Sequence, residues 1–275
     1  MKIIFFFCLF FFSICFSQNI RFSYNYKFII DTLQKDNISE EVVILDFNNE
    51  KKESIFTGLK HILSDSTMAV MSRKGIMLFP DKSMKIKYVV EKKNDSILYF
   101  YTDNHMPNPV LKVKDKRTIN WKILNEKEKI SGYPVQKAIA TFGGREWIAW
   151  FTNEIPISDG PYKFRGLPGL ILKVYDKTNT HIFEIISVQK QKSNYIVLND
   201  DTYKNVKEIS FNEYQEISKE SPLERYRKKA FSGDIIFKSS EEKQKFLKDL
   251  DIKIKESKIH DNNPIELVDV FKRKR

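Results

Sequence analysis

Two adjacent glycines, Gly143 and Gly144, divide a run of alternating apolar and polar residues into two halves. Glycine accepts the positive φ angles that a tight turn needs, so the pattern predicts a β-hairpin. In a two-residue turn Phe142 pairs with Arg145, and every other pair in the hairpin follows from that one. The glycines therefore predict an antiparallel strand pair near the middle of the chain, to which neighbouring strands can be added.

Continuing this register sorts the hairpin side chains onto two faces. Beyond the two residues that flank the turn, one face carries Ala138, Ala140, Trp147, Ala149 and Phe151. Small residues opposite a tryptophan leave room above the sheet, and two occupants fit that room. Either a helix packs into it, or it is a cavity for an apolar ligand with Trp147 as its wall. The other face is not purely polar, so we expect both faces to be covered.

An irregular connection follows the hairpin and leads into another strand. Two prolines and an Asp-Gly pair within residues 155–161 predict a loop. Pro168 and Gly169 suit the central positions of a type II turn, because proline presets φ to about −65° and glycine accepts the positive φ that follows. From Leu170 the residues alternate between two sides as far as Asp176, which predicts a strand.

This part of the chain resembles the defining motif of the GLPGLI family of secreted bacterial proteins. The six residues that give the family its name are Gly166, Leu167, Pro168, Gly169, Leu170 and Ile171. Further matches are Gly132-Tyr133, Gly144-Arg145, Ala149 to Thr152, Ile155 to Ile157, and Asn262 to Leu267, which resembles the family's closing phrase. The resemblance implies an exported envelope protein, but the family has no established activity to carry over. Where members often have a cysteine, this chain has Val135.

The N-terminus has the pattern of a secretory signal peptide. Residues 1–17 contain one lysine, a phenylalanine-rich apolar run and small residues before the expected cleavage after Ser17. Cys15 raises the question of a lipoprotein signal, but the preceding Ile14 is too large for one. Both cysteines of the chain lie within this segment, so residues 18–275 have no thiol. We expect these residues to form a single domain without disulfides or Cys-ligated metal.

The remaining pattern predicts strands first and helices last. Predicted strands are residues 20–30, 42–47, 53–57, 85–90, 97–101, 118–124, 171–176, 181–189 and 195–198, and predicted helices are 60–72, 205–219 and 239–258. This order predicts an α+β fold: a large curved antiparallel sheet, resembling an open barrel, with helices mainly in the C-terminal third.

Charge and motifs exclude several classes of function. The chain carries 47 Lys and Arg against 36 Asp and Glu, a net charge of +11. For an exported chain, anionic lipid headgroups, polysaccharide or acidic partners are better targets of this charge than nucleic acid. The four histidines, His61, His105, His181 and His260, do not have metal-binding spacing, and no HExxH, G-x-S-x-G, Walker or dinucleotide motif occurs. We therefore predict no metal, no cofactor and no catalytic residue.

Aromatic and basic residues crowd the hairpin and the connection after it. The candidate ligand-binding residues are Arg145, Trp147, Phe151, Tyr162, Phe164 and Arg165. One interpretation is core packing with cation–π contacts, and the other is the mouth of a groove for an amphipathic molecule. Loops with rigid turns and large aromatics often carry recognition on a scaffold.

These observations favour a non-catalytic periplasmic or secreted binding protein for an amphipathic or lipid-like ligand. The alternative is a structural or protein-interaction module of the cell envelope, with an outer-membrane protein as its partner and peripheral contact with the membrane. A hydrolase acting on envelope glycans or peptides is a weaker third hypothesis, with Glu146 or Asp159 as its acidic residue.

Overall fold

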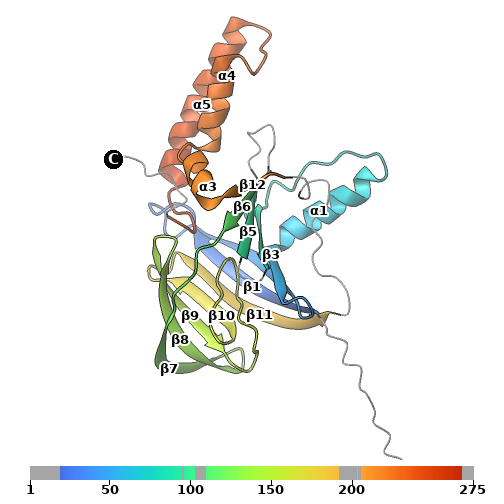
Figure 1. The fold of residues 1–275 in the computed structure, drawn as a ribbon. Helices are drawn as coiled ribbons and strands as arrows, with labels where there is room; N and C mark the ends of the chain where they lie inside the picture. The colour runs from blue at the N-terminus through green and yellow to red at the C-terminus, as the bar shows by residue number, and fades with distance from the viewer. Residues whose placement is uncertain (1–18, 94–95, 103–109, 192–202, 204–205, 268–275) are drawn as a thin grey trace, which may run out of the picture.

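The computed structural model describes residues 19–93, 96–102, 110–191, 203 and 206–267. They form one large, strongly curved β-sheet with four described helices, most of them near the C-terminus (Figure 1). The predicted signal peptide, the predicted strand 195–198 and His105 lie outside the described residues.

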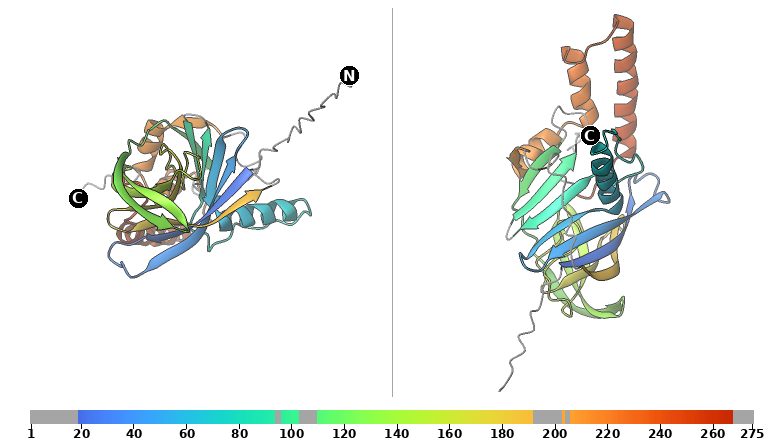
Figure 2. Two further views of the ribbon diagram at one scale, coloured as in Figure 1. Left: turned by 90° about the horizontal axis from the view of Figure 1, so that it is seen from below. Right: turned by 90° about the vertical axis from the view of Figure 1, so that its right-hand side faces the viewer.

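Twelve strands make the sheet, in the order β12-β6-β5-β4-β3-β2-β1-β11-β10-β9-β8-β7. Their bounds are β1 (Asn19–Ile29), β2 (Ile38–Asn48), β3 (Glu53–Gly58), β4 (Tyr88–Lys93), β5 (Ser96–Thr102), β6 (Val110–Asp115), β7 (Lys122–Ile130), β8 (Tyr133–Phe142), β9 (Arg145–Thr152), β10 (Leu170–Asp176), β11 (His181–Gln191) and β12 (Glu208–Ser210). Only β12 with β6 is a parallel pair among the pairings described. The sheet curls round on itself, but β12 and β7 remain its two edges, so the barrel is open (Figure 2).

The helices are α1 (Leu59–Ser72), α3 (Phe211–Ser218), α4 (Pro222–Ser232) and α5 (Ser240–His260). Serine starts both short C-terminal helices: Ser210 and Ser221 each form a capping box with a glutamate three residues on. Helices α4 and α5 pack side by side and project away from the barrel as a helical hairpin (Figure 1). Among the described helices none is both long and apolar enough to cross a membrane.

The central hairpin has the predicted register. Phe142 pairs with Arg145, and Ala140 with Trp147. Gly143 and Gly144 have φ angles of 59° and 77°, which is the requirement that the sequence indicated. The inward face of the hairpin is buried from Ala138 round to Phe151, whereas most of the other face is half-exposed or exposed, so the expected cover of both faces is found on one only.

A segment of the chain, rather than a helix or a ligand, occupies the room above the inward face. We call residues 153–169 the motif loop. Its Phe164 packs edge-on against Trp147 with the ring centroids 4.6 Å apart, and it also contacts Phe142. Both interpretations of that room were therefore wrong: the connection that follows the hairpin folds back and fills it.

The type II turn predicted at Pro168-Gly169 is also wrong. Gly169 does not have a positive φ; the left-handed glycine of this segment is Gly166, with φ 100°. Instead, the position has no room for a side chain, because a Cβ there would lie 2.0 Å from the backbone oxygen of Thr152. A close approach between the loop and the end of β9 therefore explains this glycine.

Other elements differ from the sequence prediction in detail. The strand predicted at 171–176 is present as β10, but a bulge between Ile171 and Lys173 interrupts its alternation. The helix predicted at 205–219 is a short strand, β12, followed by α3. The strand β6 and the helix α4 were not predicted. The predicted strand 118–124 begins later, at Lys122, and runs to Ile130.

Candidate functional site

The motif loop lies inside the curled sheet as a buried element rather than at its rim. Tyr162, Lys163, Phe164 and Leu167 are all inaccessible to solvent or nearly so. Tyr162 adopts a left-handed conformation with φ 52°, which is uncommon for a bulky residue and persists only where the surroundings fix it. The part of the chain that gives the strongest family resemblance is thus part of the core.

The last described segment, residues 261–267, crosses the open end of the barrel, and we call it the C-terminal strap. The Leu267 amide donates to the Gly143 carbonyl at 2.7 Å, and Asn263 Nδ2 donates to the Ile29 carbonyl at 2.6 Å. A Cβ on Gly143 would meet Glu266 Cγ at 2.7 Å. The two sequence segments that carry the resemblance, which lie far apart in the chain, are therefore in direct contact.

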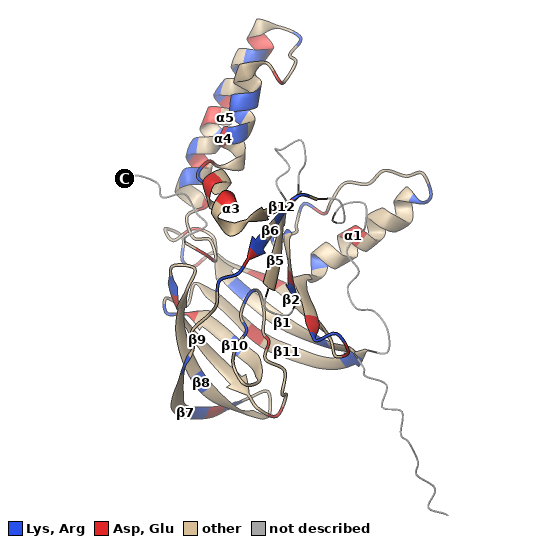
Figure 3. Ribbon diagram, in the orientation of Figure 1, with Lys and Arg blue, Asp and Glu red and all other residues tan. Residues whose placement is uncertain are grey.

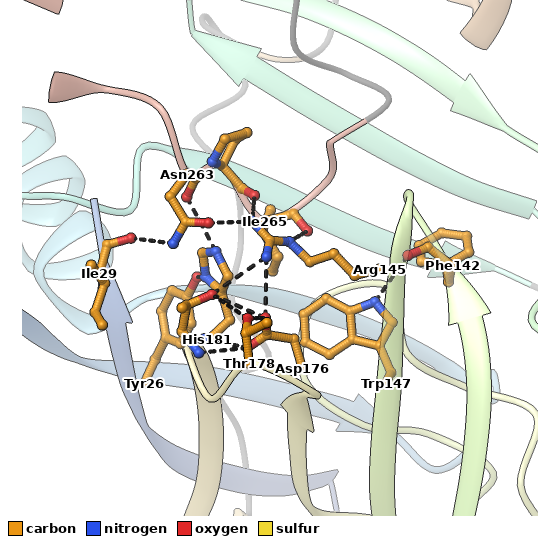
Figure 4. Close-up of polar contacts among 12 residues, drawn as sticks. Tyr26, Ile29, Phe142, Arg145, Trp147, Asp176, Thr178, His181, Asn263 and Ile265 are labelled. Atoms are coloured by element: carbon orange, nitrogen blue, oxygen red, sulfur yellow. Dashed lines mark hydrogen bonds and ion pairs between the residues drawn. The ribbon is translucent and has the colours of Figure 1, made fainter. Parts of the chain in front are cut away.

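Arg145 joins the hairpin to the strap (Figure 4). Its guanidinium donates to Asn263 Oδ1 at 2.6 Å and to the Ile265 carbonyl at 3.1 Å, and forms an ion pair with Asp176 at 3.1 Å. Burial would raise the pKa of Asp176, but hydrogen bonds from Thr178, the His181 amide and Thr180 outweigh it, and the pKa is lowered. Arg145 therefore anchors the strap within the barrel, with its charge satisfied.

His181 lies beside this cluster as a neutral side chain. Its Nδ1 is 2.7 Å from the Tyr26 hydroxyl, and its Nε2 is 3.2 Å from the Asn263 carbonyl. Burial, with the nearby charge of Arg145, lowers the pKa of His181 to about 3. Burial likewise raises the pKa of Tyr26 well above its usual value. The pair therefore contributes hydrogen bonds rather than charge.

A second buried cluster ties the motif loop to the strap. Lys163 Nζ forms ion pairs with Glu266 at 2.7 Å and with Asp115 at 3.1 Å, and Arg117 bridges the same two carboxylates. The Tyr162 hydroxyl donates to Glu266 at 2.6 Å. Burial would raise the pKa of Asp115, but the hydrogen bonds and positive charge of Arg117 and Lys163 lower it to about 2. Two cations thus balance two carboxylates in the interior.

A third pair, Lys92 with Asp159, fixes the start of the motif loop. Lys92 forms a short ion pair with Asp159 and donates to the Gly160 carbonyl at 2.6 Å. Burial lowers the pKa of Lys92, and the charge of Asp159 opposes that shift. Asp159 belongs to the Asp-Gly pair that predicted a loop, and it accepts from the Gly160 amide at 2.8 Å, but its ion-pair partner Lys92 lies across the barrel.

Above these clusters is a pocket of about 380 Å³, which we call the tyrosine pocket. Its aromatic wall consists of Tyr26, Phe28, Tyr88, Tyr99, Tyr162 and Tyr214, contributed by three strands, the motif loop and α3. The strap and the start of α4 contribute Asn263, Pro264, Ile265, Glu266, Pro222 and Arg225 to the lining. Ligand sites in proteins typically enclose roughly 300–1,000 Å³ and are mostly apolar with a few fixed polar groups, and this pocket has both properties.

One polar group of the pocket has no partner among the described residues. The Tyr88 hydroxyl is shielded from solvent and makes no hydrogen bond there. Burial, together with the charges of Glu41 and Glu266, raises the pKa of Tyr88. A buried hydroxyl without a partner is unfavourable, and a ligand that accepted its hydrogen bond would remove that cost.

The structure distributes the six sequence-predicted site residues unevenly. Tyr162 lines the tyrosine pocket. Arg145, Trp147, Phe151 and Phe164 are buried beneath it, where Trp147 Nε1 donates to the Phe142 carbonyl at 2.9 Å. Arg165 is half-buried, and its carbonyl accepts from Trp121 Nε1 at 2.9 Å. Of the six residues predicted to bind a ligand, Tyr162 therefore lies in the pocket wall, four are buried in the core, and Arg165 lies outside the lining.

Trp147 and Ala140 also border a second hollow, of about 420 Å³, on the half-exposed side of the hairpin. Its other lining residues include Ile139, Ile148 and Lys122. This hollow lacks the enclosing strap and helices of the tyrosine pocket. Sequence reasoning missed most of the tyrosine pocket, because its tyrosines are separated along the chain and only Tyr162 lies near the motif.

Among the residues that the structure describes, no group of three or more His, Cys, Asp or Glu side chains is placed to hold a metal ion. The buried carboxylates of the clusters above are already held by Lys or Arg. The arrangement can bind and enclose a small molecule, and these acidic groups are engaged in ion pairs rather than poised as acids or bases.

Comparison with known proteins gives a limited result. A family model described as a protein of unknown function (Porph_ging) matches residues 144–173, which run from the hairpin turn into β10. A search of curated proteins found no match. Two structures of PNGF-II, from two different crystal forms, are similar over 73% of this chain with 21% identity and a TM-score of 0.48.

The chain spans about a third of those PNGF-II chains, 33% and 32% of their length. An uncharacterized conserved protein from Thermus thermophilus is similar over 71% of this chain and 91% of its own, with 6% identity and a TM-score of 0.34. Structural similarity at these scores gives no basis for carrying a function over to this chain.

Proposed function

We propose that this chain is an exported, non-catalytic envelope protein that binds a small amphipathic or lipid-like ligand in the tyrosine pocket. The observation that carries the proposal is the pocket itself: about 380 Å³, mostly apolar, and walled by five tyrosines from five different segments. Tyrosine rings offer apolar area to a ligand's hydrophobic part, and their hydroxyls offer hydrogen bonds to its polar part. Export rests on the sequence pattern of residues 1–17 and on the family resemblance.

The polar groups of the pocket support an amphipathic rather than a purely apolar ligand. The unpartnered Tyr88 hydroxyl lies in the wall, and Glu266 and Arg225 lie among the lining residues. The pocket floor is also preorganised, because Tyr162 is fixed by its hydrogen bond to Glu266 and by its backbone. A preformed wall reduces the ordering cost of binding.

The first experiment is native mass spectrometry, with organic extraction, on the chain purified without detergent from its own cell envelope. We expect an adduct of lipid or similar size that is released on denaturation. A second arm titrates the extracted, ligand-free chain with a fluorescent fatty acid, cis-parinaric acid, and follows its emission.

Ser218 gives a matched pair of variants for the titration. Ser218 lines the pocket and is half-buried at the end of α3, so Ser218→Trp should fill the pocket and reduce probe affinity at least about tenfold. The neighbouring Lys219→Trp places the same bulk on an exposed position outside the lining and should leave affinity unchanged. An apo mass together with no probe binding, or equal binding by both variants, contradicts the proposal and favours the interaction-module alternative.

A further inference from the structure

The connection between α1 and β4, residues 73–87, exposes an unusual run of apolar side chains. Ile76, Met77, Leu78 and Phe79 are consecutive and all exposed, Met77 at 85% and Phe79 at 82%. Exposed apolar residues are ordinary when scattered, but four in succession place a contiguous apolar surface in water. Such a surface indicates a contact with something that the chain itself does not supply.

This connection is held in place at both ends. The Ile76 amide donates to the Met71 carbonyl at 3.0 Å, which continues the end of α1. Further along, the Asp81 amide donates to Ser64 Oγ at 3.1 Å, and Lys60 Nζ donates to Ser83 Oγ at 3.2 Å. The four apolar residues thus form the tip of a loop that is tied back to α1. Helix α1 and the connection that follows it extend away from the barrel (Figure 1).

Charge around the tip has one predominant sign. The loop contains five basic residues, Arg73, Lys74, Lys82, Lys85 and Lys87, and one acidic residue, Asp81. All six are exposed. Apolar side chains flanked by exposed cations match the boundary between the acyl chains and the headgroups of a membrane that contains anionic lipids.

The helical hairpin provides a contrast within the same molecule. Its tip exposes Phe231 at 69% and Ile236 at 95%, so its apolar exposure is comparable. Between residues 228 and 243, however, four lysines are balanced by three acidic residues. Figure 3 shows both signs interspersed along α4 and α5. Charge complementarity to an anionic surface therefore favours the α1–β4 loop over the hairpin tip.

We propose that the α1–β4 loop docks the protein on a membrane surface that carries anionic lipids, with Ile76 to Phe79 inserted among the headgroups. Electrostatic attraction brings the loop to the surface, and burial of the apolar tip holds it there. The far end of the same loop contributes Lys85 and Ile86 to the tyrosine pocket, so a docked loop brings the pocket near the lipid.

The test measures binding of the chain, isolated from its native envelope, to vesicles by co-sedimentation. Vesicles of phosphatidylglycerol with phosphatidylethanolamine are compared with vesicles of phosphatidylcholine alone. We expect binding to the anionic vesicles only, with affinity falling as salt is added. The double variant Met77→Ser/Phe79→Ser should reduce that affinity about tenfold or more, and Lys74→Gln/Lys82→Gln should reduce both the affinity and its salt dependence.

Two controls separate this loop from general surface hydrophobicity. Phe231→Ser/Ile236→Ser removes a similar exposed apolar area from the hairpin tip, and Leu33→Ser removes an exposed leucine from the β1–β2 connection. Neither should change vesicle binding. All of these side chains are exposed, so each variant should keep the melting temperature of the parent chain.

Three outcomes overturn the proposal. The first is a parent chain that does not bind anionic vesicles. The second is equal binding by the parent and the loop variants, or loss of binding in the hairpin variant instead. The third is a dimer in solution that the loop variants convert to a monomer, because the partner of the tip would then be a second copy of the chain.

Discussion

The two halves of the molecule differ in where their charged side chains are paired. In the half built on β8 to β11, the motif loop and the strap, the charged side chains inside the curled sheet are buried and paired. Lys163 is an example, because it pairs with Glu266 of the strap and with Asp115 of β6. In the half that carries α1 and the α4–α5 hairpin, ion pairs are exposed, as Arg227 is with Asp251, and large apolar side chains face solvent. The difference indicates that the buried pairs of the motif loop and the strap hold the barrel together, while the membrane contact proposed above lies in the other half.

The physical cause of the difference is desolvation. A buried charge is unfavourable unless its partners are placed accurately, so the pairs of the motif half have one acceptable arrangement of loop and strap. Exposed ion pairs are screened by water, so they do little to fix one arrangement of the chain. The following predictions test this contrast, in order of decreasing effect.

The largest effect is expected from Lys163→Met. The substitution leaves Asp115 and Glu266 with Arg117 as their remaining described cation, and we expect a loss of about 3–5 kcal/mol in the free energy of unfolding. Urea denaturation followed by tryptophan fluorescence measures it. The matched control is Lys177→Met, which breaks the exposed pair with Glu146 and should leave the unfolding midpoint unchanged. Similar losses in both variants would show that burial does not distinguish an interior ion pair from an exposed one.

The second largest effect is expected from Gly169→Ala, with a loss of about 3 kcal/mol in the free energy of unfolding. The added Cβ would collide with the Thr152 carbonyl in a well-packed region. Gly75→Ala is its control in the other half. Gly75 has open space around it but a φ of 73°, so only the left-handed backbone opposes a side chain there, at about 1 kcal/mol. Thermal unfolding compares the two. A larger loss at Gly75 would mean that the contact between motif loop and β9 is not tight.

The third prediction concerns the pH dependence of stability. The contribution of His181 to it is small at neutral pH and grows on acidification. His181 is neutral when folded, with its pKa lowered to about 3, whereas the unfolded chain takes up that proton near the usual value of about 6.5. Acidification therefore favours the unfolded state, and stability is lost from about pH 6.5 downwards towards pH 3. His181→Gln should flatten this slope.

Other groups also titrate over part of this range. Burial lowers the pKa of His61, and the buried carboxylates Asp115 and Glu266 have lowered pKa values that act at more acid pH. The quantity to compare is thus the difference between the parent and His181→Gln at each pH, measured by urea denaturation from about pH 7 to about pH 4. A difference that is constant across this range would refute the assignment of a buried neutral histidine.

Local chemistry explains what the sequence could predict of the fold. Gly143 and Gly144, together with a few neighbouring residues, specify the hairpin, so its register could be predicted correctly. The strand β6 was missed because Asp115, at an inward position, masks its apolar alternation. Helix α4 was missed although two signals could have revealed it. Ser221 with Glu224 is a capping box, and Leu223, Tyr226 and Ala230 have the i, i+3, i+7 spacing of a helix.

The site was less predictable, because burial depends on contacts between distant segments. In the sequence nothing distinguishes Lys163 from a surface lysine, and only the fold places it against Asp115 and Glu266. The sequence pattern of Gly169 indicates a turn glycine. In the structure, however, the position requires glycine because the backbone near Thr152 lies too close for a side chain. The match at Asn262 to Leu267 pointed to the strap without showing that it packs on the hairpin turn.

The smallest effect on stability is expected at the boundary between the two halves, in the tyrosine pocket. Tyr88→Phe removes a buried hydroxyl that has no described partner, so the unfolding free energy of the ligand-free chain should stay the same or rise slightly. If the ligand uses that hydroxyl, affinity for cis-parinaric acid should nevertheless fall several-fold, which corresponds to about 1 kcal/mol. Tyr175→Phe, on a half-buried tyrosine outside the pocket lining, should change neither quantity. A destabilised Tyr88→Phe with unchanged affinity would place the Tyr88 hydroxyl among the paired groups of the core and move the polar contact of the ligand to Glu266 or Arg225.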